Sequence, residues 1–155
     1  MLGGDRYAKK RTGRPEFGNL RVGNKITPNR RKSMFSAHII MYIDNKEQEN
    51  QDSYTVFENI YLINYPTYDE AMVAAEVAGK SSEGDESGSL TVDGKPAVWV
   101  FAGVRKIVEV DNLCIEPGDN VKDCIEITYN EYIVNSKLDI TMLANGENTI
   151  INHYN

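Results

Sequence analysis

The sequence predicts an α+β fold: a mostly antiparallel β-sheet with one packed helix and an extended basic N-terminal arm. Three observations lead to this fold class. Runs in which apolar side chains alternate with polar ones recur along residues 34–155, separated by turn signals. A single stretch combines helical spacing with a capping box. The charge is divided unequally between residues 1–33 and the remainder of the chain.

The strands are predicted from alternating or β-rich runs. These runs cover residues 35–43, 54–65, 97–110, 124–134, 138–143 and 149–154. Asp93-Gly94 is typical of a tight hairpin turn before the third run, and Asn145-Gly146 is typical of one before the last. Gly103 marks a bulge or bend in a run that is long for one strand. The run at 124–134 predicts one shared face, formed by Ile125, Ile127, Tyr129 and Ile133.

The helix is predicted to follow Thr67, whose hydroxyl can accept a hydrogen bond from the amide of Glu70. Apolar residues with helical spacing, mostly alanine, come next, and Gly79 is a suitable end. Because alanine is small, this helix can lie close to a sheet. Residues 80–89 then predict a polar, acidic, exposed loop.

The N-terminal arm is strongly basic and the body is acidic. Residues 1–33 hold ten basic and two acidic residues, a net charge of +8. Residues 34–155 hold seven basic and 21 acidic residues, a net charge of −14, so the whole chain carries −6. Glycine and proline are frequent in the arm and apolar residues are sparse, which predicts a flexible segment. We therefore expect residues 34–155 to form one α+β domain.

The basic arm predicts contact with an anionic partner, either a nucleic acid or an acidic surface, because Lys and Arg that neutralise phosphates release counterions. The candidate residues are Lys9, Lys10, Arg11, Arg14, Arg30, Arg31 and Lys32. Two other interpretations stay open. The arm folds onto its own acidic body, or it is an upstream extension of a protein that begins at Met34.

A resemblance to a known family covers about residues 34–120. The positions that carry it are Thr67, Glu70, Ala71, Gly79, Lys80, Gly94, Lys95, Trp99, Phe101 and Val104. With these residues the region resembles the small bacterial family called domain of unknown function 4288. The resemblance implies a fold and no activity. The arm and residues 121–155, where we expect additional strands, depart from the family pattern.

Residues typical of catalytic or metal chemistry are few. Cys114 and Cys124 have nine residues between them, which is not a zinc-binding spacing, and the chain has only two histidines, His38 and His153. We expect cysteines that pack as small apolar residues. The expectation is therefore no enzyme activity, no cofactor and no metal site.

Two groups of residues are candidates for a protein interface. Phe57, Tyr61 and Tyr65 recur along one strand, and tyrosine offers both an apolar ring and a hydroxyl. The acidic side chains of Glu83, Asp85 and Glu86 lie in the loop after the helix. A half-buried sheet face and a solvated loop are the alternatives for these two groups.

The first functional hypothesis is a non-enzymatic structural or assembly protein of a virion-like or ribosome-like particle. Its acidic body docks on protein and its basic arm on an anionic partner. The alternative is an inhibitor or immunity-type protein whose acidic body binds a basic toxin or nuclease. We expect a bacterial or phage protein without membrane span or signal peptide, located in the cytoplasm or within a particle. An oligomer is compatible with either hypothesis.

Overall fold

The computed structural model describes residues 33–47, 51–84, 90–110 and 123–153. The elements, in chain order, are β1 (Ser33–Asn45), β2 (Tyr54–Tyr65), α1 (Tyr68–Ser81), β3 (Thr91–Val92), β4 (Lys95–Glu109), β5 (Cys124–Val134) and α2 (Lys137–Ala144). The strands form one curled five-stranded sheet in the order β3-β4-β1-β2-β5, and every pairing is antiparallel. The predicted α+β fold class is therefore confirmed.

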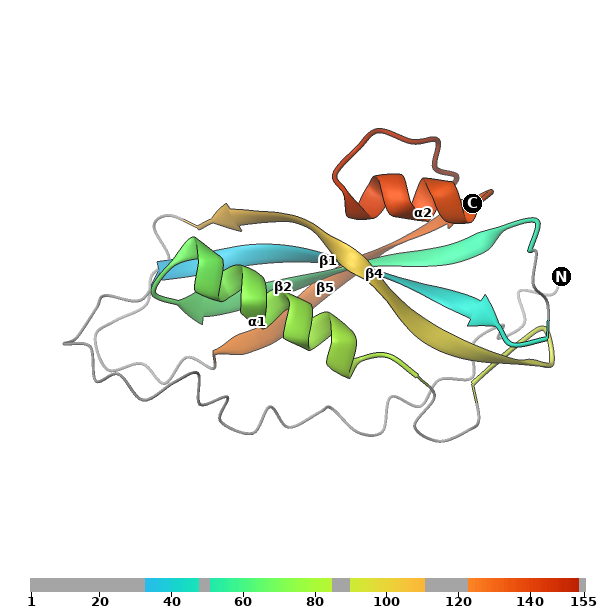
Figure 1. Ribbon diagram of the computed structural model, residues 1–155, viewed down its shortest axis with the longest axis horizontal. Helices are drawn as coiled ribbons and strands as arrows, with labels where there is room; N and C mark the ends of the chain where they lie inside the picture. The colour runs from blue at the N-terminus through green and yellow to red at the C-terminus, as the bar shows by residue number, and fades with distance from the viewer. Residues whose placement is uncertain (1–32, 48–50, 85–89, 111–122, 154–155) are drawn as a thin grey trace, which may run out of the picture.

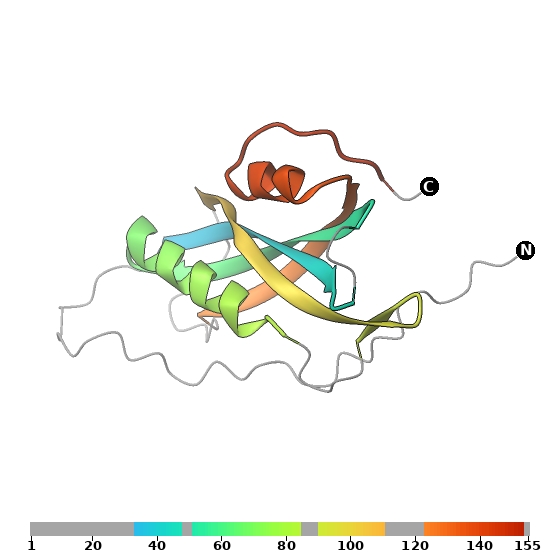
Figure 2. The same cartoon turned by 45° about the vertical axis from the view of Figure 1, so that its right-hand side comes forward.

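The two helices cover opposite faces of the sheet (Figures 1 and 2). Helix α1 packs against β4, β1 and β2, and α2 packs against β4 and β1. Alternate residues of each central strand consequently enter different cores. Phe35 and Ile39 of β1 belong to the core under α1, whereas Ile40 belongs to the core under α2.

Helix α1 begins where the capping signal predicts. The hydroxyl of Thr67 accepts a hydrogen bond from the amide of Glu70 at 3.3 Å. The carboxylate of Glu70 accepts from that same hydroxyl at 3.0 Å. The stripe that faces the sheet is small and buried, formed by Ala71, Ala75, Ala78 and Gly79. Within the described residues, no helix is long and apolar enough to cross a membrane.

The strand predicted at 138–143 is wrong, because these residues belong to α2. The hydroxyl of Ser136 accepts from the amide of Asp139 at 3.2 Å, so a Ser-x-x-Asp cap starts a second helix. Ile140, Leu143 and Ala144 are buried at helical spacing. The expectation of a single helix is corrected to two.

The last strand, predicted at 149–154, is also not formed as such. In the described part of this segment, Asn152 makes one isolated antiparallel bridge to Ile133. The predicted hairpin between β3 and β4 is present. Its turn residues, Asp93 and Gly94, have φ values of 51° and 77°, as the favoured two-residue hairpin turn requires.

Register shifts bend the sheet at three places. Two lie between β1 and β4 and flank Gly103, which confirms the predicted irregularity there. The third lies between β2 and β5, where Tyr61 pairs with Glu126 but Ile60 pairs with Thr128. This bulge moves Ile125 and Tyr129 to opposite faces, so the single apolar face expected for this strand is wrong.

Replacing Gly79 by alanine tests how closely α1 approaches the sheet. A Cβ at Gly79 would lie 2.3 Å from the Phe101 ring and 3.1 Å from Cγ2 of Ile39. In an exposed helix the same change stabilises by about 1 kcal/mol. Here we expect Gly79→Ala to lower the free energy of unfolding by about 1–3 kcal/mol, because the core is overpacked. Urea unfolding measures this.

The control is Val73→Ala, at a position of α1 that is 52% exposed. We expect a change within about 0.5 kcal/mol. A Gly79→Ala protein as stable as the natural chain would show that the helix can move off the sheet at no cost.

Candidate functional site

Most of the charged residues expected to bind partners lie outside the described part of the chain. These are Lys9, Lys10, Arg11, Arg14, Arg30, Arg31, Lys32, Asp85 and Glu86. Glu83 is described, and its carboxylate accepts a hydrogen bond from the backbone amide of Phe101 at 3.0 Å. The neighbouring Gly84 pairs with Trp99 of β4. Glu83 thus helps to hold the chain after α1 against β4.

The three aromatic candidates of β2 share the α1 face but differ in exposure. Tyr61 is buried, and its hydroxyl donates to Glu126 at 3.1 Å. Burial, together with the charge of Glu126, raises the pKa of Tyr61. Tyr65 packs at the margin of the same core, whereas Phe57 is half-buried and contacts the rings of Trp99 and Tyr129.

The cysteine prediction can be followed for Cys124 alone, since Cys114 lies outside the described residues. Cys124 is a free, half-buried thiol packed against the core under α1. Burial raises its pKa to about 11. The thiolate is the reactive form of cysteine, so burial disfavours reaction of this side chain at neutral pH.

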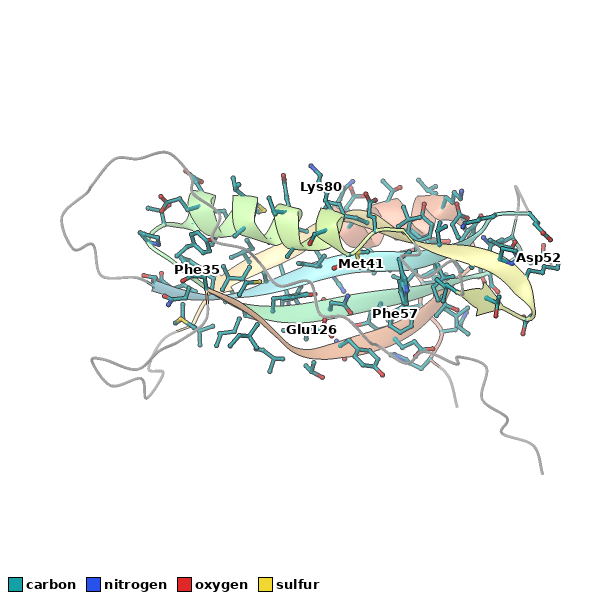
Figure 3. All side chains as sticks on the ribbon, turned by 90° about the horizontal axis from the view of Figure 1, so that it is seen from below. Phe35, Met41, Asp52, Phe57, Lys80 and Glu126 are labelled. Carbon is teal, nitrogen blue, oxygen red and sulfur yellow. The ribbon has the colours of Figure 1, made fainter. Side chains whose placement is uncertain are left out.

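Among the described strands, β5 lies at one edge of the sheet (Figure 3). It carries exposed apolar side chains. Ile125, Ile127 and Tyr129 are 38%, 57% and 50% exposed. The helices make their main contacts with β4, β1 and β2 rather than with β5. An edge strand with exposed apolar side chains is a template for pairing with another strand.

The direction of the outer backbone groups follows from the bridge at Ile133. Both the amide and the carbonyl of Ile133 bond to Asn152, so they point away from β2. Backbone groups alternate along an antiparallel strand. The amides and carbonyls of Tyr129 and Glu131 therefore point to the same outer side. Within the described residues, Asn152 is the only backbone partner on that side of β5.

The charge of this edge has one sign. Residues 123–136 contain Asp123, Glu126 and Glu131 and no lysine or arginine. Burial raises the pKa of Glu131, so a positive neighbour would favour its charged form. The edge of β5 therefore combines exposed apolar side chains with negative charge.

A second notable feature is a carboxylate buried on the α2 face of the sheet. Glu58 of β2 is only 3% exposed. It accepts hydrogen bonds from His38 Nδ1 at 2.8 Å and from the Tyr132 hydroxyl at 2.6 Å. Arg105 Nη1 and Asn130 Nδ2 each lie 3.4 Å from Oε2. Four donors from three neighbouring strands thus converge on one carboxylate.

These donors keep Glu58 ionised in spite of its burial. Burial alone raises the pKa of the carboxyl, but the hydrogen bonds from Tyr132 and His38 and the charge of Arg105 outweigh it. The net effect is a pKa below the ordinary value. Burial and the contact with Glu58 together raise the pKa of Tyr132 to about 12, so its hydroxyl stays protonated and donates.

The ionised carboxylate also determines the state of His38. A carboxylate only accepts hydrogen bonds, so Nδ1 of His38 carries the proton. In the neutral ring Nε2 is then an acceptor, and it lies 3.4 Å from the hydroxyl of Ser36 on the same strand. Ser36, His38 and Glu58 thus form a hydrogen-bonded series from a hydroxyl through an imidazole to a carboxylate.

Sequence reasoning missed this group and considered His38 only among the few residues typical of metal or cysteine-dependent chemistry. One signal was available, because Glu58 is the only charged residue of β2. A lone carboxylate in a central strand requires donors from adjacent strands. Which strands are adjacent depends on the sheet order, which the sequence pattern does not contain. Among the described residues, no three His, Cys, Asp or Glu side chains gather as metal ligands.

The comparison with family models identifies the family of the chain. The model described as Domain of unknown function (DUF4288) matches residues 34–121, more than half of the 155 residues. The chain belongs to the DUF4288 family. The resemblance inferred from the sequence is thereby confirmed. Neither the curated proteins nor the solved structures gave a match.

The DUF4288 match contains most of the group around Glu58 but not the edge of β5. It includes β1, β2, α1, β3 and β4, and with them Ser36, His38, Glu58 and Arg105. Strand β5 and helix α2 lie beyond it, and so do Asn130 and Tyr132. The edge formed by β5 thus belongs to a strand outside the matched region.

Changing Glu58 to glutamine tests the buried carboxylate. Its folded pKa is lowered, so its contribution to stability is complete above the unfolded pKa of about 4.3 and is lost as pH falls through the folded value. We expect Glu58→Gln to lower the free energy of unfolding at neutral pH by about 1–3 kcal/mol. The acid-induced loss of stability should also be shallower, as urea midpoints at several pH values would show.

The matched control is Lys137→Gln, which removes the exposed ion pair between Lys137 and Asp44 at 3.2 Å. That pair contributes about 0–1 kcal/mol. Equal acid profiles for the natural chain and Glu58→Gln would contradict a stabilising role for the carboxylate.

Proposed function

We propose that this DUF4288 protein is an assembly protein whose acidic body docks on another protein through the edge of β5. The observation that carries the proposal is the acidic and apolar edge at Ile125, Ile127 and Tyr129, beside which the described residues place no further strand. A partner strand that pairs there gains main-chain hydrogen bonds from the edge and specificity from the side chains.

The chemistry of the edge indicates which partner segment fits. Its side chains combine exposed apolar surface with the carboxylate of Glu131. An extended segment with alternating apolar and basic residues would bury the exposed apolar side chains and neutralise the carboxylate. Opposite charges also increase the rate of encounter. The basic arm supplies a separate contact with an anionic partner, so the chain can join two components of one particle.

The same edge supports the second candidate function, an inhibitor or immunity-type protein that covers a basic toxin or nuclease. The observation that favours it is the absence of lysine and arginine from residues 123–136. The two candidates differ in the part played by the arm. An assembly protein needs residues 1–33 for its anionic contact, whereas an inhibitor binds as well or better without their positive charge.

Binding of a short peptide of alternating valine and lysine tests the edge. With the full chain, we expect amide exchange to slow at Tyr129 and Glu131, because their outward groups become hydrogen-bonded. Ile127→Lys and Tyr129→Lys should each weaken binding by about tenfold or more, about 1.4 kcal/mol, through like-charge repulsion. Titration followed by NMR gives both the affinity and the location.

The control is Val73→Lys, since Val73 is 52% exposed and Ile127 is 57% exposed. We expect no loss of affinity in this variant. Protection located away from β5, or an equal loss in Val73→Lys, would sink the proposal that β5 is the docking edge.

Removing the arm distinguishes the two candidate functions. The full chain and a 34–155 truncation are used as baits, each with and without nuclease treatment. For an assembly protein we expect the truncation to lose co-purifying nucleic acid or particle components, because the arm carries +8 of charge. Undiminished capture of one basic protein by the truncation would favour the inhibitor instead.

A further inference from the structure

The hydrogen-bonded series of Ser36, His38 and Glu58 has the order of groups that activates a serine hydroxyl. Oε1 of Glu58 lies 2.8 Å from Nδ1 of His38, and Nε2 of His38 lies 3.4 Å from Oγ of Ser36. The carboxylate holds the ring in the tautomer that has an acceptor facing the hydroxyl. A carboxylate, an imidazole and a hydroxyl in this order constitute an acid–base–nucleophile site.

We propose that Ser36 is the nucleophile of an acyl-transfer site that accepts the acyl group of an activated ester or thioester. His38 is its general base, and Glu58 is a positioning residue. This activity goes beyond the docking role of β5 and does not depend on it, because none of the three residues lies on that strand.

The positions of the three groups are fixed by packing. The side chain of Glu58 is 4% exposed, and the hydroxyl of Tyr132 donates to it at 2.6 Å. His38 retains 15% side-chain exposure, and Ser36 is half-buried. The acid is therefore enclosed, whereas the imidazole and the hydroxyl both keep partial exposure. Hydrogen bonds of catalytic groups are often long in free enzymes and shorten when substrate binds, which accommodates the 3.4 Å separation.

The register of the sheet gives the surroundings of the hydroxyl. Ser36 pairs with Leu62 on β2 and with Val108 on β4, and paired residues share a face. Val108 is 50% exposed, so these two side chains offer an apolar surface on both sides of the nucleophile. An apolar acyl chain fits this surface. His38 pairs with the exposed Lys106 of β4. Lys106 thus places a positive charge beside the imidazole, where it can stabilise the oxyanion that forms.

The reaction consumes one ester and one water molecule and involves no oxidation. Oγ of Ser36 attacks the carbonyl carbon, and its proton passes to Nε2 of His38. The tetrahedral intermediate collapses when the bond from carbon to the leaving oxygen or sulfur breaks, and the leaving group takes the proton. Water then attacks the acyl–Ser36 ester with His38 again as base, which releases the carboxylic acid and restores the hydroxyl.

The test uses the full chain and p-nitrophenyl butyrate, with mass spectrometry of peptides and release of p-nitrophenolate as the two measurements. We expect a butyryl group on Ser36 of the natural chain and none on Ser53, which is exposed. Ser36→Ala should remove the adduct and Ser53→Ala should leave it unchanged. His38→Gln should slow acylation by about 100-fold, the usual contribution of a general base.

The positioning role of Glu58 is tested by the ring nitrogens of His38. In ¹⁵N NMR spectra we expect a protonated Nδ1 in the natural chain and a mixture of tautomers in Glu58→Gln, together with slower acylation. Absence of an adduct on Ser36 together with p-nitrophenolate release no faster than in Ser36→Ala would overturn the proposal, and so would equal modification of Ser53. Locating the butyryl group on the natural chain by mass spectrometry requires no variant. This result therefore holds even if one of the variants fails to fold. An unchanged rate in His38→Gln would remove the base from the mechanism.

Discussion

The carboxylate of Glu58 imposes the strictest requirement on this fold. An ion enclosed by an apolar sheet face is costly unless hydrogen-bond donors surround it. Its donors come from β1, β4 and β5, while Glu58 itself lies on β2. All four strands must therefore pair in the correct register before the charge is satisfied. A polar group of this kind selects one arrangement among many that bury similar apolar area.

Two cores depend on that arrangement, and each helix covers one of them. Central strands buried on both faces need apolar side chains in nearly every position, as β1 shows with Ile39, Ile40 and Met41 in succession. The small face of α1 covers one side and the short α2 covers part of the other. Chain beyond the DUF4288 match thus completes the second core.

Local signals predicted the elements that depend on neighbouring residues. The strand Tyr54–Tyr65, the cap at Thr67 and the turn at Asp93-Gly94 all follow from short-range chemistry. Helix α2 was missed because alternating apolar residues at Leu138, Ile140 and Met142 also fit a strand, although Ser136 carried a capping signal.

The features that relate distant residues could not be predicted in the same way. The bulge in β5 depends on how β2 and β5 align, and it inverts the faces of Ile125 and Tyr129. The group around Glu58 joins residues up to 74 positions apart. Its members are unremarkable singly in the sequence, and only the order of strands brings them together. The edge of β5 was likewise visible only once that order was known.

The bulge of β5 opposite Ile60 and Tyr61 affects how readily copies of the protein pair with one another in a crowded cell. A long, flat, apolar edge would allow copies of the chain to add to one another without limit, as in fibrils. The bulge twists β5 at Ile127, and Asn152 occupies the strand at Ile133. Between these two points remains a short stretch of edge. Such a short stretch disfavours open-ended pairing between copies of the chain.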